Sequence, residues 1–230
     1  MSQENTDRFE NEIDKIKTRY LHRENISSFK YNPLNPAIYM INQEKERVFI
    51  KWLRTFALSE IQNLRLLEIG CGSGQNLIQF IKLGFSPNLL VGNELLPKRV
   101  ESAKKKLPDN LKIIEGDALK VDLPLNYFDI VFQSMVFSSI LNKEFKYALA
   151  QKMWKLVKPG GGVLWYDFIY NNPQNPDVRG IPFKEVRMLF PYSDIQKWRV
   201  TLAPPLSRAV TSIHPLLYSI INIFPFLRSH

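Results

Sequence analysis

The chain of 230 residues contains a single cysteine, Cys71, and no long uninterrupted apolar run. One cysteine excludes an intramolecular disulfide framework and is compatible with a reducing compartment. Residues 1–8 are polar and lack the apolar core that a signal peptide needs. Residues 204–226 are largely apolar, but prolines divide them into pieces shorter than the roughly 20 residues that span a bilayer. We therefore expect a cytoplasmic protein without a transmembrane helix.

The composition is that of an ordinary globular protein, with 45% apolar and 23% charged residues. The length suits one domain with a small appended cap. The formal charge of +9 permits attraction to nucleic acid, to an anionic membrane surface or to an acidic substrate. No basic run is interleaved with base-stacking aromatic residues, which makes nucleic acid an unfavoured partner. The acidic residues are scattered, so we predict no metal site.

The most informative segment is residues 66–76, which read Leu-Leu-Glu-Ile-Gly-Cys-Gly-Ser-Gly-Gln-Asn. An apolar strand pattern runs into three glycines at alternate positions, where the backbone can turn sharply and a ligand can approach closely. Dinucleotide-binding turns use Gly-x-Gly-x-x-Gly, so the third glycine comes one residue early here. Glu68 precedes the first glycine by two residues, where a carboxylate would repel a phosphate. The segment predicts a nucleotide cradle for a ligand with a cation and no phosphate.

This Glu-x-Gly-x-Gly-x-Gly pattern resembles the first motif of the class I S-adenosylmethionine-dependent methyltransferases. Four further segments are similar to the strands and turns that follow in that family: residues 89–94, 113–118, 128–133 and 156–165. The resemblance covers about residues 45–170. It implies an α/β fold with a seven-stranded Rossmann-like sheet, its last strand antiparallel, and helices on both faces. N-terminal helices and a C-terminal helical cap complete the expected architecture.

The resemblance also implies S-adenosyl-L-methionine as the cofactor. Glu94 would hold the ribose hydroxyls, and it lies 20 residues after Gly74, where a ribose-binding acid is expected. Asp117 and the backbone N–H of Ala118 would contact the adenine. We read Cys71 as a small packing residue of the turn. The full expected cofactor-binding set is Glu68, Gly70, Cys71, Gly72, Gly74, Asn76, Glu94, Leu95, Asp117, Ala118 and Gln133.

Along the chain, helical spacing of apolar residues predicts helices over residues 7–21 and 41–58, separated by a proline-rich loop. A short helix is expected from 182 to 190 and a sixth strand from 195 to 202. We divide the chain into an N-terminal helical segment covering the cofactor and substrate site (1–60), a methyltransferase core (61–203) and a C-terminal cap (204–230). Two interpretations of the cap stay open: helices packed on the sheet and substrate pocket, or a lid that touches lipid or a lipid-linked substrate.

Several further stretches, including residues 133–140, 164–168, 178–181 and 202–206, are similar to bacterial methyltransferases found with polysaccharide and glycolipid assembly genes. This resemblance implies methylation of a hydroxyl on a small-molecule, sugar or glycolipid acceptor. One alternative is a natural-product O- or N-methyltransferase with a planar aromatic or heterocyclic acceptor. Another is a non-catalytic subunit that binds the cofactor. Either a monomer or a homodimer is compatible with the sequence.

A sugar hydroxyl must lose its proton as it attacks, so an O-methyltransferase benefits from a base, usually a histidine or a carboxylate. Asp167, at the end of the fifth expected strand, is the first candidate. His22 and His214 belong to the two segments expected to cover the site and are the next candidates. The candidate substrate-binding residues are Tyr39, Tyr166 and Arg179. Gln133-Ser134-Met135 stands where DNA adenine methyltransferases have Asn-Pro-Pro-Tyr or Asp-Pro-Pro-Tyr, which argues against that reaction.

Overall fold

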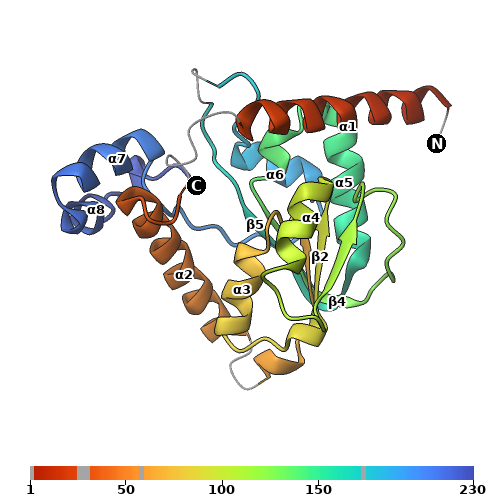
Figure 1. Cartoon of the computed structure of the whole chain (residues 1–230), viewed down its shortest axis with the longest axis horizontal. Helices are drawn as coiled ribbons and strands as arrows, with labels where there is room; N and C mark the ends of the chain where they lie inside the picture. Colours follow the sequence, from red (N-terminus) through yellow and green to blue (C-terminus); the bar gives the residue numbers. More distant parts are fainter. Residues whose placement is uncertain (1–2, 25–31, 57–59, 172–174) are drawn as a thin grey trace.

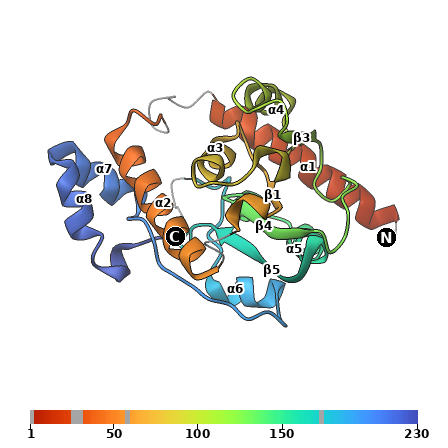
Figure 2. The same cartoon turned by 90° about the horizontal axis from the view of Figure 1, so that it is seen from below.

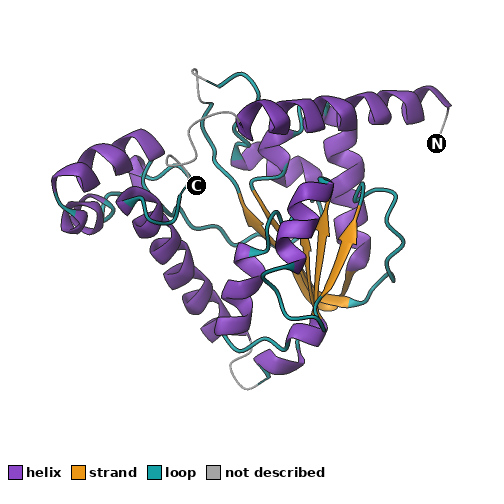
Figure 3. Ribbon diagram, viewed as in Figure 1, coloured by secondary structure: helices purple, strands orange, loops and turns teal. Residues whose placement is uncertain are grey.

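The computed structural model describes residues 3–24, 32–56, 60–171 and 175–230. Its centre is a parallel sheet in the order β3-β2-β1-β4-β5, drawn in orange in Figure 3. The strands are β1 (Leu66–Ile69), β2 (Leu90–Glu94), β3 (Lys112–Glu115), β4 (Phe128–Ser134) and β5 (Val157–Tyr166). The strand order reverses between β1 and β4, and in such open α/β sheets ligands bind beyond the carboxyl ends of the strands at that switch point.

Helices cover both faces of the sheet and extend to one side of it (Figure 1). The α-helices are α1 (Gln3–Glu24), α2 (Pro36–Phe56), α3 (Gln75–Lys82), α4 (Pro97–Lys104), α5 (Lys143–Leu156), α6 (Phe183–Leu189), α7 (Pro204–Ile213) and α8 (Pro215–Ile221). Short 3-10 turns are η2 (Ile61–Asn63), η3 (Pro87–Leu89), η4 (Phe137–Ser139) and η5 (Pro225–Leu227). Figure 2 shows α3 and α6 on opposite sides of the strands.

The two faces of the sheet bury separate apolar clusters because successive side chains of a strand point to opposite faces. Leu66 packs with residues of α2, α3 and the end of α4, whereas Leu67 packs with residues of α1, α5 and α6. Both leucines are fully buried. The same alternation places Glu68, which follows Leu67, on the face that α2 and α3 cover. A carboxylate is thereby buried beneath the glycine turn.

The sheet differs from the seven-stranded prediction. In the described residues it has five strands, all parallel, and residues 195–202 do not form a sixth strand of it. Residues 196–199 are all exposed, so the expected alternation of buried and exposed side chains fails there. Residues 200–202 instead pair with residues 228–230, through an antiparallel bridge between Leu202 and Arg228 and backbone hydrogen bonds on either side of it.

The predicted helices are confirmed with shifted ends. The helix expected over 7–21 is α1, the one over 182–190 is α6, and the one over 41–58 begins earlier, at Pro36. Its expected last two residues, 57 and 58, lie outside the described residues. The division of the chain at residues 60 and 203 stays a prediction.

Residues 204–227 form α7, α8 and η5, which lie beside α2 at the edge of the molecule farthest from α5 (Figures 1 and 2). Their buried cluster joins Met40 of α2 to Leu202, Val210 and Tyr218. The helices α7 and α8 thus pack on α2, which differs from the expected packing on the sheet, whereas His230 at the end of the same segment stacks on Tyr166 of β5. Among the described residues, no helix combines the length and the apolarity that crossing a membrane requires.

A candidate nucleotide cradle and its cavity

The turn after β1 owes its shape to three glycines in the left-handed region, where side chains are disfavoured. Their φ angles are +67° at Gly70, +56° at Gly72 and +84° at Gly74. A Cβ at Gly70 would come within 2.5 Å of Cγ2 of Val136, so this glycine lets the loop after β4 approach the turn. A Cβ at Gly72 would meet nothing within 4 Å. The turn therefore leaves open space over its middle glycine, where a ligand can lie against the backbone.

The last residue of β2 connects this turn to the neighbouring loop. Glu94 is 5% exposed, and its Oε2 accepts a hydrogen bond from the N–H of Gly72 at 2.8 Å. Its Oε1 accepts one from the N–H of Leu96 at 2.9 Å. Each carboxylate oxygen can accept a second hydrogen bond, so both remain available to hydroxyl donors of a ligand.

The loop after β3 supplies a second acid. Asp117 Oδ1 accepts a hydrogen bond from the N–H of Leu119 at 2.9 Å, which closes a turn beside the cavity. Burial raises the pKa of Asp117. Asn93 of β2 donates to the carbonyls of Ile114 and Gly116 and so holds this loop against the sheet. The two acids are thus positioned at the carboxyl ends of adjacent strands.

Lys45, Asn76 and Glu68 form a chain of polar groups under the turn, in which Glu68 is fully buried. Lys45 Nζ donates to Asn76 Oδ1 at 2.7 Å, and Asn76 Nδ2 donates to Glu68 Oε1 at 2.6 Å. Burial raises the pKa of Glu68 to about 7 and lowers the pKa of Lys45. Glu68 Oε2 is buried and has no hydrogen-bond partner among the described residues. This orphaned carboxylate oxygen suits a ligand that brings a hydrogen-bond donor or a positive charge, and it disfavours a phosphate.

A cavity of about 990 Å³ begins at the glycine turn and extends past the end of β4. Its volume falls at the upper end of the range for sites that bind small molecules and cofactors. Of the expected cofactor residues it is lined by Gly70, Cys71, Gly72, Asn76, Glu94, Leu95, Asp117 and Ala118. A second part of the cavity wall is formed by side chains of α1, including Ile13, Ile16 and Tyr20. A third part is formed by residues 203–205.

Three expected cofactor residues do not line the cavity. Glu68 lies beneath it, and Gly74 begins α3, where a Cβ would meet Leu107 at 2.7 Å. Gln133 is fully buried, accepts a hydrogen bond from the N–H of Val136 and lies 3.4 Å from the carbonyl of Tyr166. It therefore holds the loop after β4 in place. Met135 is the first residue of that loop, and it lines the cavity. Its φ of +63° is a strained angle for a methionine.

Cys71 is buried within the turn, with 4% of its surface exposed. Burial raises the pKa of its thiol, and the neighbouring carboxylates of Glu68 and Glu94 raise it further. The Sγ atom lies 3.8 Å from the carbonyl oxygen of Gly72. A neutral buried thiol agrees with a packing role rather than with a nucleophile.

Asp167 is near the cavity without lining it. Its carboxylate accepts hydrogen bonds from the N–H groups of Ser138 and Phe168, at 3.1 and 3.0 Å. Both of these partners line the cavity. Burial raises the pKa of Asp167 to about 7. The carboxylate is therefore linked to the acceptor region through the backbone of Ser138.

Four other residues predicted for the site lie away from the cavity. His22 is exposed, with Nδ1 3.9 Å from Asp177 Oδ2, and His214 is exposed and caps α8 by accepting from the N–H of Leu216. The hydroxyl of Tyr39 accepts a hydrogen bond from Gln43, and Tyr39 is 54% exposed. The exposed Arg179 contributes only its backbone, which donates to the carbonyl of Ser138.

The structure brings an unpredicted histidine to the cavity. His230 lines it, and its ring stacks on Tyr166 with 4.9 Å between centroids and an interplanar angle of 2°. Nδ1 of His230 lies 2.7 Å from Oγ1 of Thr201, which in turn lies 3.2 Å from the hydroxyl of Tyr166. Burial, assisted by the charge of Lys45, lowers the pKa of His230 to about 4. Its imidazole is consequently neutral at pH 7.

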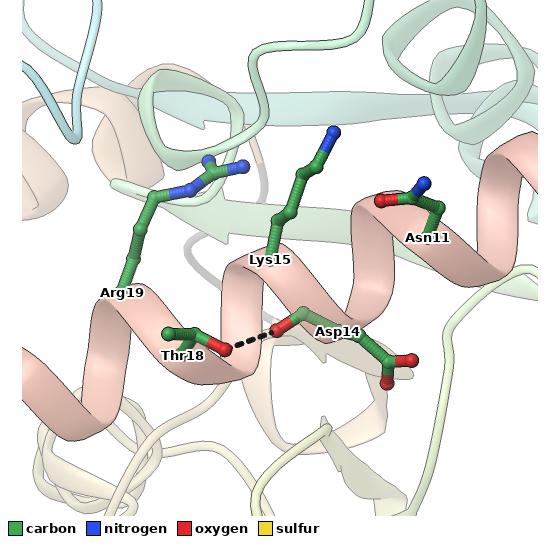
Figure 4. A pocket seen from close by; sticks show the side chains of 5 residues that line it. All are labelled: Asn11, Asp14, Lys15, Thr18 and Arg19. Atoms are coloured by element: carbon green, nitrogen blue, oxygen red, sulfur yellow. Dashed lines mark hydrogen bonds between the residues drawn. The ribbon is translucent and has the colours of Figure 1, made fainter.

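A shallow depression on α1 is separate from this cavity. Five side chains of the one helix surround it: Asn11, Asp14, Lys15, Thr18 and Arg19 (Figure 4). The Thr18 hydroxyl donates to the carbonyl of Asp14, as the dashed line in Figure 4 shows. Arg19 bonds the carbonyl of Ser139 at 2.6 Å and Glu12 at 3.0 Å. The contact between Arg19 and Ser139 attaches α1 to η4 at the cavity wall, which is a structural role, and the other two contacts lie within α1.

The doubly wound parallel sheet, the glycine turn at its switch point and the acids after β2 and β3 define a nucleotide-binding α/β protein. Comparison with known families narrows this class. Residues 66–161 match the family described as "Methyltransferase domain". These residues form a methyltransferase domain, and the class predicted from the turn, the S-adenosylmethionine-dependent methyltransferases, is confirmed for this part of the chain.

Individual relatives agree with this class. An uncharacterized methyltransferase from Bacillus cytotoxicus is 34% identical over 46% of this chain and 47% of its own length. A sterol 4-C-methyltransferase from Caenorhabditis elegans is 26% identical over 50% of this chain and 34% of its own length. The chain thus spans less than half of the length of these relatives. A solved SAM-dependent methyltransferase from Archaeoglobus fulgidus shares the fold, with a TM-score of 0.50, 15% identity and coverage of 76% of this chain and 90% of its own.

Proposed function

We propose that this protein transfers a methyl group from S-adenosylmethionine to a small-molecule acceptor. The observation that carries the proposal is the cavity itself, which joins the glycine turn and its two acids to a region past β4 with room for a second molecule. The cofactor would supply a methyl group already activated on a sulfonium. The chain then has to bind both partners, orient them and receive a proton.

The residues of the cradle fit the cofactor in charge and in shape. Glu94 would accept hydrogen bonds from the ribose hydroxyls while keeping its bonds to Gly72 and Leu96. Asp117 would accept from the adenine amine. The open space over Gly72 would take the nucleoside, and the buried carboxylate of Glu68 would favour the cationic end of the ligand. No step of this binding requires a metal or a phosphate site.

His230 is our candidate for the group that removes the acceptor proton. In the tautomer in which Nδ1–H donates to Thr201 Oγ1, the lone pair of Nε2 is available as a base. Stacking on Tyr166 fixes the plane of the ring. Asp167, the first candidate from the sequence, contacts the cavity only through Ser138 and would act by positioning that loop.

The wall beyond the cradle supports a hydroxyl-bearing acceptor. The polar side chains of that wall are Ser134, Ser138, Ser139, Asn171, Asn175 and Arg208, set in a lining that is mainly apolar. Such groups suit the many hydroxyls of a sugar, and we propose a free or lipid-linked sugar as the acceptor class. The aromatic residues Tyr20, Phe168 and Tyr170 also line the cavity, which supports the alternative of a planar acceptor.

Transfer of label from methyl-labelled S-adenosylmethionine to a panel of sugars, glycolipids and phenols tests the function. We expect label in a hydroxyl-bearing acceptor and none in reactions without protein. The variant His230→Asn should lose about 10²-fold to 10⁴-fold in kcat and keep its affinity for S-adenosylhomocysteine, because only the base is removed. His214→Asn removes an exposed histidine and should change neither quantity.

Two outcomes would contradict the proposal at different levels. Full activity of His230→Asn together with an inactive His214→Asn would return the catalytic role to the exposed histidine. Tight binding of S-adenosylhomocysteine with no labelled acceptor anywhere in the panel would favour the non-catalytic subunit. Absence of cofactor binding would remove the function altogether.

A further inference from the structure

The cap carries a group of large apolar side chains that point to solvent. Six of them fall between residues 213 and 226 and form what we call the apolar face: Ile213, Leu216, Ile220, Ile223, Phe224 and Phe226, which are 48–78% exposed. Leu216 and Ile220 are four residues apart on α8 and so share one side of that helix. Single exposed apolar residues are ordinary, but a group of this density marks an interaction surface.

The opposite side of α8 is apolar as well. Leu217, Tyr218 and Ile221 pack against Met40 and Val210, so the inner side alone accounts for the attachment of α8 to α2 and α7. A helix that is apolar on all sides is normally buried on all sides. The outer side of α8 therefore requires a partner that the packing of the described residues does not supply.

The charges of the segment indicate which partner this is. Residues 195–230 contain four basic residues and no aspartate or glutamate. Lys197 lies over the ring of Phe183 on α6, and Arg208 lines the cavity, so the charges beside the apolar face are those of Arg199 and Arg228. Within the described part of the chain, Arg228 donates to the backbone carbonyls of Asn222 and Arg199, and these bonds do not neutralise its charge. A second copy of the chain placed face to face would bring the same positive charges together. An anionic surface would be attracted instead.

We propose that the apolar face docks on the surface of an anionic lipid bilayer. The apolar side chains would enter the boundary between headgroups and acyl chains, and the basic residues would meet the lipid headgroups. The helices would lie in the interface rather than span the membrane. This inference holds independently of methyl transfer, because none of the six apolar residues lines the cavity.

Docking would also place the cavity close to the bilayer. Pro204, Pro205 and Arg208 of α7 line the cavity, and the same helix ends at Ile213 of the apolar face. Figure 1 shows α7 and α8 together at one end of the molecule, on the outer side of α2. If the proposed function holds, a lipid-linked acceptor could reach the cavity from the bilayer surface.

Co-sedimentation with vesicles tests the docking. We expect the protein to sediment with vesicles of phosphatidylglycerol and phosphatidylcholine, and to do so much less with phosphatidylcholine alone or at high salt. The double variant Ile220→Asn/Phe226→Asn should lower the partition coefficient at least ~10-fold, because it removes two inserted apolar side chains. The matched control is Leu125→Asn/Met188→Asn, which changes two residues that are 59% and 60% exposed elsewhere on the surface. It should bind vesicles like the wild type.

Circular dichroism and S-adenosylhomocysteine affinity show whether each variant is folded. A site-specific label provides a second measurement, since the only natural cysteine, Cys71, is buried. An environment-sensitive dye on Phe226→Cys should shift to shorter wavelength with anionic vesicles, and the same dye on Leu125→Cys should not. This comparison separates insertion of the apolar face from general adsorption.

Three results would overturn the proposal. The first is a wild-type protein that does not sediment with anionic vesicles at any salt concentration. The second is a control pair that reduces binding as much as the test pair. The third is a stable dimer in light scattering that Ile220→Asn/Phe226→Asn dissociates, with no vesicle binding. That result would assign the apolar face to a second copy of the chain. Failure of vesicle binding with intact cofactor affinity would leave the proposed function untouched.

Discussion

The glycine cradle and the C-terminal cap both contact α2, and they differ in the side chains that they bury and expose. The cradle buries carboxylates and an ammonium group and presents backbone N–H groups and open space. The cap buries one side of α8 and exposes isoleucine, leucine and phenylalanine on the other. A small polar ligand requires fixed hydrogen-bond partners in a closed site, whereas an extended apolar partner requires only exposed area. Each region is therefore suited to a partner that the other would reject.

From this difference we expect changes in the cradle to alter ligand affinity, and changes in the cap to alter stability or surface binding.

The largest effect is expected for Gly72→Ala. Its Cβ meets no protein atom, so the fold tolerates it apart from about 1–2 kcal/mol of strain at a φ of +56°. The methyl group would occupy the space needed by the nucleoside. We expect S-adenosylhomocysteine affinity, measured by calorimetry, to fall by about 100-fold or more, which is roughly 3 kcal/mol.

Gly160→Ala is a matched control for that strain. Gly160 also has a positive φ, +81°, and an added Cβ would meet nothing within 4 Å, but the residue does not line the cavity. It should lose similar stability and keep its ligand affinity. Equal affinities for the two variants would show that the space over Gly72 is not the nucleoside site.

A second substitution in the cradle tests how its buried carboxylate makes the free energy of unfolding depend on pH. Burial raises the pKa of Glu68 to about 7, above its ordinary 4.5, so the folded state binds this proton more tightly than the unfolded state does. Its contribution to the free energy of unfolding is therefore largest at low pH and is lost as pH rises from about 4.5 through 7. Glu68→Gln removes the titrating carboxyl group, and with it the loss of stability as the pH rises. The variant should match the wild type near pH 4 and exceed it by up to about 3 kcal/mol at pH 8.

Urea unfolding of the ligand-free protein at several pH values measures this difference. Asp167 also has a pKa raised to about 7, but it is present in both proteins and cancels in the comparison. Glu115→Gln, on an exposed residue of the edge strand β3, is the control and should show a difference that does not change with pH. A flat difference for Glu68→Gln as well would mean that the buried carboxylate is stabilised by partners the structure does not reveal.

The smallest effect is expected in the cap. The hydroxyl of Tyr218 accepts a hydrogen bond from the N–H of Leu202 at 3.3 Å, and Tyr218 is 1% exposed. Tyr218→Phe leaves that buried N–H without this partner and should cost about 1 kcal/mol of unfolding free energy, with cofactor affinity unchanged. Tyr192→Phe, at a residue that is 98% exposed, should cost nothing measurable. A loss of cofactor affinity in Tyr218→Phe would show that cap and cradle are not independent.

The cradle was predictable because its signal is local. A strand, three glycines and an acid at each of the next two strand ends are read from short stretches of sequence, and the structure brings Gly72, Glu94 and Asp117 to one cavity as expected. The helices of the core were predictable for the same reason. Their apolar spacing is periodic over enough residues to decide the element, although not its ends.

The residues that lie far apart in sequence were not predictable in this way. His230 reaches the cavity because residues 228–230 pair with 200–202. Lys45 is linked to Glu68 through Asn76 because α2 packs over that face of the sheet. Neither neighbour is implied by local spacing. The expected strand at 195–202 was wrong because a period of two cannot reveal whether a partner strand is present. His22 and His214 were chosen for their segments, and the structure exposes both, His22 on α1 and His214 at the junction between α7 and α8.

The buried state of Cys71 has a consequence for the durability of the protein. A sulfonium methyl donor bound in the cradle would lie next to the sole thiol of the chain, and a thiolate there would be alkylated by it. The carboxylates of Glu68 and Glu94 and the surrounding apolar side chains keep the thiol protonated and therefore unreactive. The two acids proposed to favour a cationic ligand would thus also keep Cys71 from being methylated by it.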